Sequence, residues 1–242
     1  IVYLRATPGP GTQAGGASSH IKGVVDGLIK LQAQVEIISN DTIAGLDENK
    51  LKLTVIPPEP LGVTRAVFDV HNNAVFTRGV LNEIQDRVPD FIYQRYARFS
   101  WAGVAASLQT KRPLFLEYNG SEVWLGRHWD QVKRLDLLER YERLNLAAAT
   151  RIFVVSQVER NNLERSGVAR EKIIVNPNGV DTDIFRPHVG GAAKRNELGV
   201  RQDEQLVGFV GTGWGVVLKI SPFGLNAVET IQKTGKSTNI IT

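Results

Sequence analysis

The sequence predicts an α/β fold, in which a Rossmann-like parallel sheet carries helices on both faces. Short apolar runs alternate with longer segments of helical periodicity along most of the chain. This alternation is typical of doubly wound domains. The runs are also too uniformly apolar for a sheet with one solvent-facing side, so we expect strands that are buried on both faces.

Each predicted strand is a short run of apolar, often β-branched residues bounded by polar or turn-forming residues. In chain order the strands are Ile1–Arg5, Val35–Ser39, Leu53–Pro57, Phe91–Gln94, Leu114–Tyr118, Ile152–Val155, Ile173–Val175 and Leu206–Val210.

Helical segments are predicted between these strands. Ser19 is a suitable cap for the first helix, in which Ile21, Val25 and Leu28 recur at helical spacing. The other predicted helices are Ala66–Asp86, Trp101–Gln109, Asp130–Ala148 and Val158–Ser166. The segment after Tyr118, with Trp124 and Trp129, is predicted to be a loop, and its aromatic side chains either stack on a sugar ring or pack over the rim of a cleft.

The regular alternation of strands and helices ends after residue 176, where proline and glycine are frequent and apolar residues are few. We therefore expect an N-terminal domain over residues 1–187, a linker over 188–204 and a second Rossmann-like unit over 205–242. A complete domain of this kind needs roughly 100–150 residues, so the second unit is expected to be incomplete. The chain contains no methionine and begins inside a predicted strand, so we expect an excerpt or a processed fragment.

Composition limits the classes of function. No apolar run approaches the roughly 18 residues that a membrane span needs. The absence of cysteine excludes disulfides and thiolate chemistry and fits a reducing cytoplasm. The net charge of +4 comes from 29 basic and 25 acidic residues that are mixed along the chain, which does not favour a nucleic-acid-binding face. The four histidines show no paired spacing with carboxylates, so we expect no metal site.

A glycine-rich segment follows the first strand and leads into the first helix. It contains Gly9, Gly11, Gly15 and Gly16. Backbone amides of such a segment, together with a helix N-terminus, can bind phosphate. The spacing is not that of dinucleotide-binding proteins, and no acidic residue ends the second strand. From these residues alone, a phosphate site and a tight structural turn remain equally supported.

Five further stretches resemble group-1 (family 4) retaining glycosyltransferases of the GT-B fold. They are Gly15-Gly16 with His20, Asp90-Phe-Ile-Tyr-Gln-Arg-Tyr96 with Ala102-Gly103, Leu116-Glu-Tyr-Asn-Gly-Ser-Glu122, Val154-Val-Ser156, and Ile174-Val-Asn-Pro-Asn-Gly-Val-Asp181 with Phe185-Arg-Pro187. They occur in the order found in that family, over about residues 1–212. The resemblance implies the N-terminal domain of a two-Rossmann enzyme.

The tail resembles the donor-site motif of the same family. Ser221-Pro-Phe-Gly-Leu-Asn-Ala-Val-Glu229 is similar to E-P-F-G-L-x-x-x-E, with serine in place of the first glutamate. In the family this motif lies much further from the strand that matches Leu206–Val210. We therefore expect an internal deletion or a misjoined reading frame between about Gly213 and Ile220.

The resemblance implies transfer of a sugar from a nucleoside-diphosphate sugar to a glycan, lipid or small-molecule acceptor, with retention of configuration and without a metal or other cofactor. It implies cytoplasmic glycan biosynthesis, with peripheral contact at the inner face of the membrane. The candidate residues are Asn119 and Glu117 for catalysis, His20, Arg95 and Glu122 for the acceptor, and Gly15, Gly16, Phe223, Gly224, Leu225 and Glu229 for the donor and its phosphates. Histidine is common in the family where this chain has Asn119, and asparagine can orient a hydroxyl but cannot act as a base.

Two alternatives remain. One is a non-catalytic fragment or degraded copy that binds a ligand or a partner weakly, and we expect no measurable transfer by the 242-residue chain itself. The other is an unrelated Rossmann-type dehydrogenase or epimerase, which the missing acidic residue and the Asn176–Asp181 stretch disfavour. For Glu122 an exposed loop charge, and for Arg95 an ion pair with a neighbouring carboxylate, are the simpler readings.

Overall fold

The structure is a computed structural model. It describes residues 1–7, 16–47, 49, 51–129, 132–186, 191–197, 199–201, 205–211, 214–220 and 228–232. The chain divides into two compact units, Ile1–Gly179 and Val180–Thr242, and each is described by itself. The predicted division into residues 1–187, 188–204 and 205–242 stays a prediction.

The first unit is built on a seven-stranded sheet with the order β3-β2-β1-β4-β5-β6-β7. All six strand pairs are parallel. The strands are β1 Val2–Arg5, β2 Glu36–Ser39, β3 Lys52–Val55, β4 Ile92–Arg95, β5 Leu114–Tyr118, β6 Arg151–Val154 and β7 Ile173–Val175. Each strand overlaps a predicted one, and the sheet order reverses at β1, as in doubly wound folds. The predicted fold class is confirmed for this unit.

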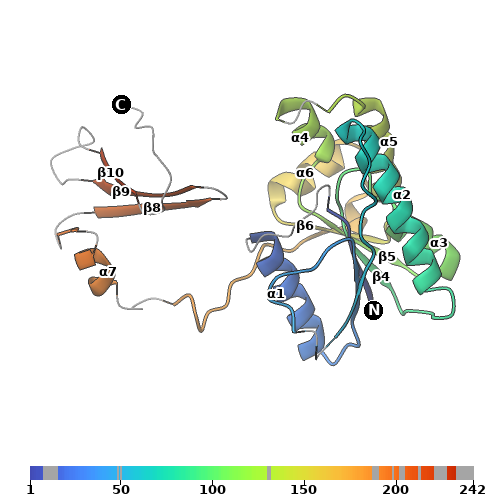
Figure 1. Ribbon diagram of the computed structural model, residues 1–242, viewed down its shortest axis with the longest axis horizontal. Helices are drawn as coiled ribbons and strands as arrows, with labels where there is room; N and C mark the ends of the chain where they lie inside the picture. The colour runs from blue at the N-terminus through green and yellow to red at the C-terminus, as the bar shows by residue number, and fades with distance from the viewer. Residues whose placement is uncertain are drawn as a thin grey trace. The chain divides into compact units, whose positions relative to one another are not determined.

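Helices cover both faces of this sheet. They are α1 Gly16–Lys30, α2 Arg65–Glu83, α3 Ala102–Thr110, α4 Glu122–His128, α5 Leu135–Ala148 and α6 Gln157–Arg165, with a short 3₁₀ turn at Arg170–Lys172. Figure 1 shows α1 on one side of the sheet and α2 and α3 on the other. Alternate side chains of the strands supply the two cores. Tyr3 and Ile37 pack with Ile21 of α1, whereas Leu4 packs with Phe76 of α2.

Two predictions about helices are wrong. Ser19 lies inside α1, whose described part begins at Gly16, so Ser19 does not cap that helix. The segment predicted as a loop after β5 contains α4, and the predicted helix Asp130–Ala148 begins at Leu135 instead. Ser121 is the N-cap of α4, because its hydroxyl accepts a hydrogen bond from the amide of Trp124.

The second unit differs from the expected Rossmann-like remnant. The helix α7 Ala192–Glu197 lies in the expected linker. The strands β8 Gln205–Gly211, β9 Trp214–Ile220 and β10 Val228–Gln232 then form an antiparallel sheet in the order β10-β9-β8. Only residues 212 and 213 separate β8 from β9. A parallel pair needs a crossover of a dozen residues or more, so this connection enforces antiparallel pairing.

Within the described ranges, none of the helices is both long and apolar enough to span a bilayer.

Candidate active site

The carboxyl ends of four neighbouring strands of the first unit carry polar side chains in register. Arg5 of β1 pairs with Ser39 of β2 on one side and with Arg95 of β4 on the other, and Arg95 pairs with Glu117 of β5. Residues in register on parallel strands point to the same face of the sheet. The strand order therefore places a polar row at the edge where open α/β sheets bind ligands.

Glu117, on β5, is the last residue of this row and is only 3% exposed. One of its oxygens, Oε1, accepts hydrogen bonds from Nδ2 of Asn119 at 2.7 Å and from the guanidinium of Arg95. The other, Oε2, accepts from the hydroxyls of Tyr3 at 3.4 Å and Tyr93 at 3.3 Å. Every oxygen of this buried carboxylate is thus already engaged by protein donors.

His20 reaches the same carboxylate from helix α1. Its Nε2 atom lies 3.0 Å from Oε1 of Glu117. The ring nitrogen has no aligned hydrogen-bond partner, so the contact is a close approach rather than a directed hydrogen bond. We call the six residues the Glu117 cluster: His20, Arg95, Glu117, Asn119, Tyr3 and Tyr93.

The cluster keeps Glu117 ionised. Burial by itself would raise the pKa of Glu117, but the contact with His20, the charge of Arg95 and the hydrogen bond from Asn119 outweigh it and lower the pKa below its ordinary value. Burial raises the pKa of both Tyr3 and Tyr93, so their hydroxyls stay protonated and can donate. A carboxylate with a lowered pKa is a weak base at neutral pH.

The outer members of the cluster are the groups that a ligand can reach. The side chains of His20 and Arg95 are 20% and 22% exposed, and Asn119 is exposed at the end of β5. Together they present an imidazole, a guanidinium and an amide at one edge of the sheet. Such groups can hydrogen-bond sugar hydroxyls or phosphate oxygens.

Of the predicted site residues, His20, Arg95, Glu117 and Asn119 are brought together, and Glu122 is not part of the cluster. Glu122 is the first residue of α4, and its Oε2 lies 3.3 Å from Nε of Arg98. The ion pairs of Arg95 with Glu117 and of Glu122 with Arg98 both exist.

The predicted roles of the donor-side residues stay predictions. Gly16 is the first described residue of α1, and a Cβ atom there would meet open space. Gly15, Phe223, Gly224 and Leu225 lie outside the described residues. The backbone of Glu229 is in β10, opposite Lys219. In the described part of the chain, no three His, Cys, Asp or Glu residues are grouped as a metal site would require.

The sequence did not single out a second buried carboxylate, Glu142 of α5. It accepts hydrogen bonds from the hydroxyls of Tyr118 at 3.0 Å and Ser121 at 2.7 Å, and from the amide of Val123 at 3.3 Å. Burial raises its pKa, although these donors oppose the shift. Glu142 is four residues from both Leu138 and Leu146, so helical periodicity alone could have placed it on the buried face.

Comparison with known proteins identifies the family. The model for Glycosyltransferase Family 4 matches residues 14–184. Two solved structures are similar: HepE from Anabaena, solved with UDP and glucose, at 18% identity and a TM-score of 0.54, and WaaG, a glycosyltransferase involved in lipopolysaccharide biosynthesis, at 12% identity and a TM-score of 0.60. The UDP-GlcNAc 2-epimerase of Neisseria meningitidis, solved with UDP-GlcNAc, matches at 15% identity and a TM-score of 0.51. At such identities the likeness shows the fold alone.

The matches cover 81%, 85% and 74% of this chain, but 50%, 53% and 46% of HepE, WaaG and the epimerase. The chain thus spans about half the length of these structures. No curated protein matches it in sequence. Because the family model spans well over half of its residues, the chain belongs to Glycosyltransferase Family 4.

Proposed function

We propose that this chain is the acceptor-side half of a nucleotide-sugar-dependent glycosyltransferase of the GT-B fold. The observation that carries the proposal is the Glu117 cluster at the carboxyl edge of the sheet, in a chain of Family 4. HepE, a structural neighbour, was solved with UDP and glucose. This supports a hexosyl group carried by a nucleoside diphosphate.

The proposed reaction retains the configuration at the anomeric carbon. The bond from this carbon to the diphosphate oxygen breaks, and a bond to the acceptor oxygen forms. The electron pair of the broken bond leaves with the nucleoside diphosphate, which also accepts the acceptor's proton. No metal or other cofactor is needed, since a helix N-terminus and an arginine can stabilise the leaving charge.

Glu117 acts in this scheme as a positioning residue. Its oxygens are saturated by four donors and its pKa is lowered, so it holds its neighbours in place rather than accepting a proton. Asn119 orients an acceptor hydroxyl, while His20 and Arg95 bind other groups of the acceptor. Gly15 and Gly16 supply backbone amides to the diphosphate.

The donor-side roles follow from the family resemblance alone. The amides of Phe223, Gly224 and Leu225 bind the sugar and phosphate, and Glu229 accepts hydrogen bonds from ribose hydroxyls. In this proposal an internal deletion or a misjoined reading frame between about Gly213 and Ile220 removes the remainder of the donor half. The enzyme works in the cytoplasm, with peripheral contact at the inner face of the membrane.

A non-catalytic copy is the competing function. The antiparallel sheet β8–β10 favours it, because this sheet occupies the part of the chain where a parallel donor domain was expected to begin. We therefore expect little or no transfer by the 242-residue chain on its own.

Nucleotide release separates the two functions. The 242-residue chain and the product of the uninterrupted coding sequence across Gly213–Ile220 are incubated with UDP-glucose, GDP-mannose and ADP-glucose. Turnover by the longer product and none by the chain is the expected result. Turnover by the chain itself would overturn the deletion, and a continuous short frame without turnover would establish the non-catalytic copy.

A further inference from the structure

A long groove opens on the first unit between helices α4, α5 and α6. Its volume is about 1220 Å³. One end is lined by Asn119 and Ser121, directly after β5, and the other end by Lys172 beside the start of β7. Pockets for single small molecules measure roughly 300–1,000 Å³, so this groove has room for more than one sugar ring. It therefore leads away from the Glu117 cluster, with which it shares Asn119.

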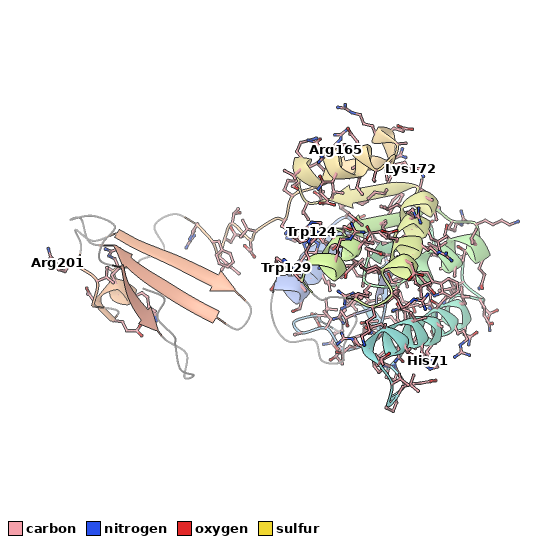
Figure 2. The ribbon with its side chains drawn as sticks, turned by 90° about the horizontal axis from the view of Figure 1, so that it is seen from above. His71, Trp124, Trp129, Arg165, Lys172 and Arg201 are labelled. Carbon is pink, nitrogen blue, oxygen red and sulfur yellow. The ribbon has the colours of Figure 1, made fainter. Side chains whose placement is uncertain are left out.

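An exposed tryptophan forms part of the groove wall. Trp124 of α4 lines the groove and is 51% exposed. Its ring is held in place, since the centroid lies 4.9 Å from the ring of His128 and 5.9 Å from that of Trp129. Figure 2 shows Trp124 and Trp129 side by side, with Lys172 well away from both. An exposed aromatic face in a groove lined by both apolar and charged side chains suits the apolar face of a sugar ring.

Charged groups of both signs surround this tryptophan. Glu139, Arg143 and Glu159 line the groove along with Arg127, whose guanidinium lies 3.1 Å from Glu139. The buried carboxyl of Glu142 lies at the end nearest Asn119. Neighbouring carboxylates and guanidinium groups can accept from and donate to adjacent sugar hydroxyls.

The same balance of charge disfavours docking on an anionic membrane. A membrane-binding surface gathers uncompensated lysine and arginine. Here Arg127 is paired with Glu139, and Arg134 is paired with Asp136 at 3.1 Å. The aromatic surface thus lies among mixed charges, which suits a neutral, hydroxyl-rich ligand.

We propose that the groove binds an oligosaccharide, and that this oligosaccharide is the acceptor of the reaction. The hydroxyl that receives the sugar lies at Asn119, the next ring stacks on Trp124, and later rings extend toward Lys172. The identification as acceptor rests on the proposed function, whereas the binding of an oligosaccharide does not.

Binding is tested on the 242-residue chain without any donor. Maltotriose, cellotriose, chitotriose and glucose are titrated by isothermal calorimetry into the wild type and into Trp124→Ala. At least one trisaccharide is expected to bind, tighter than glucose, and Trp124→Ala is expected to weaken it at least tenfold. Leu108→Ala is the control, since Leu108 is an exposed apolar residue of α3 outside the groove lining, and it should stay within about twofold of the wild type.

A second pair of variants tests the direction of the groove. Lys172→Ala should weaken the trisaccharide but leave the corresponding disaccharide unchanged. Arg165→Ala, on α6 but outside the groove lining, should change neither. Circular dichroism of each variant verifies folding.

Three results would overturn the proposal: no saccharide binding by the wild type, equal binding by Trp124→Ala, or tight binding to phosphatidylglycerol vesicles that Trp124→Ala abolishes. Failure of the proposed function is distinguishable from these, because it would leave saccharide binding intact while no nucleotide is released.

Discussion

At the residue scale, the candidate site depends on one buried carboxylate, which side chains from three other elements contact. Tyr3 comes from β1, His20 from α1, and Arg95 and Tyr93 from β4. These contacts join segments that are far apart in the sequence. The charge of Glu117 therefore contributes both to stability and to the placement of the groups a ligand can reach.

Replacing Glu117 by glutamine should destabilise the fold. Arg95 loses its buried counter-charge but can turn partly toward solvent, so we expect a loss of about 2–3 kcal/mol in the free energy of unfolding at pH 7. Urea denaturation measures this loss. Glu59→Gln is the control, because Glu59 forms an exposed pair with His71 and should cost under about 1 kcal/mol. Equal effects of the two substitutions would show that the Glu117 cluster does not contribute to the free energy of unfolding.

The contribution of Glu117 should depend on pH. Its pKa in the folded state is lowered, so the stabilisation is present above the unfolded-state value of about 4.3 and is lost as pH falls through the folded-state value. The difference in unfolding free energy between wild type and Glu117→Gln should thus shrink as pH falls below about pH 4. A difference that stays undiminished at about pH 3 would contradict the ionised cluster.

The sequence predicted His20, Arg95, Glu117 and Asn119 but not the tyrosines of the cluster. The family resemblance singled out His20, Glu117 and Asn119, and Arg95 follows from its place at a strand end, which parallel pairing brings to the same edge as Glu117. Tyr3 and Tyr93 read as ordinary apolar strand residues. Their position two residues before Arg5 and Arg95 was the available signal, because it places them on the same face of the sheet. Their hydroxyls donate to Glu117 because that carboxylate is buried, and the sequence alone does not show that Glu117 is buried.

At the element scale, close packing of α3 against the sheet depends on Gly103. A Cβ atom there would lie 2.7 Å from Oε1 of Gln94 and 2.9 Å from Cδ1 of Leu114. Gln94 has little room to move, since its amide also donates to Asn145 at 2.7 Å and accepts from the amide of Gly103 at 2.5 Å.

Two glycine-to-alanine substitutions should therefore have opposite signs. Gly103→Ala should cost about 1–3 kcal/mol through overpacking, despite the better helix propensity of alanine. Gly23→Ala, in α1 where a Cβ meets nothing within 4 Å, should stabilise by up to about 1 kcal/mol. Thermal unfolding of both variants measures these changes in stability. Stabilisation by Gly103→Ala would contradict the close approach of α3 to the sheet at this position.

Helix α4 shows why some elements escape sequence reasoning. Its seven residues include Gly126 and a mixture of aromatic and charged side chains, with too few turns for a helical period to appear. Its start is fixed by contacts of Ser121 and Val123 with Glu142, which is distant in sequence. The antiparallel sheet β8–β10 was missed for another reason: the family resemblance of its first strand suggested a parallel continuation.

At the scale of the whole molecule, the two compact units predict where the chain is vulnerable to proteases. Phe185 is 69% exposed, just after the boundary at Gly179, whereas Phe76 and Phe99 are buried. Limited chymotrypsin digestion should cut after Phe185 well before it cuts after Phe76 or Phe99. Mass spectrometry should then find a fragment that ends at Phe185. Simultaneous cleavage at the buried sites would contradict an independently stable first unit.

The central claim is that the Glu117 cluster is the acceptor-side half of a sugar-transfer site. The most direct test is the rate of nucleotide release by the turnover-competent product of the uninterrupted reading frame, compared between His20→Ala and His71→Ala. His71 is the matched control. It lies on α2, pairs with Glu59 and is not part of the Glu117 cluster. We expect His20→Ala to lower kcat at least tenfold, about 1.4 kcal/mol in the barrier, and His71→Ala to leave it unchanged. Equal rates in the two variants, or no turnover by any product with any donor, would contradict it.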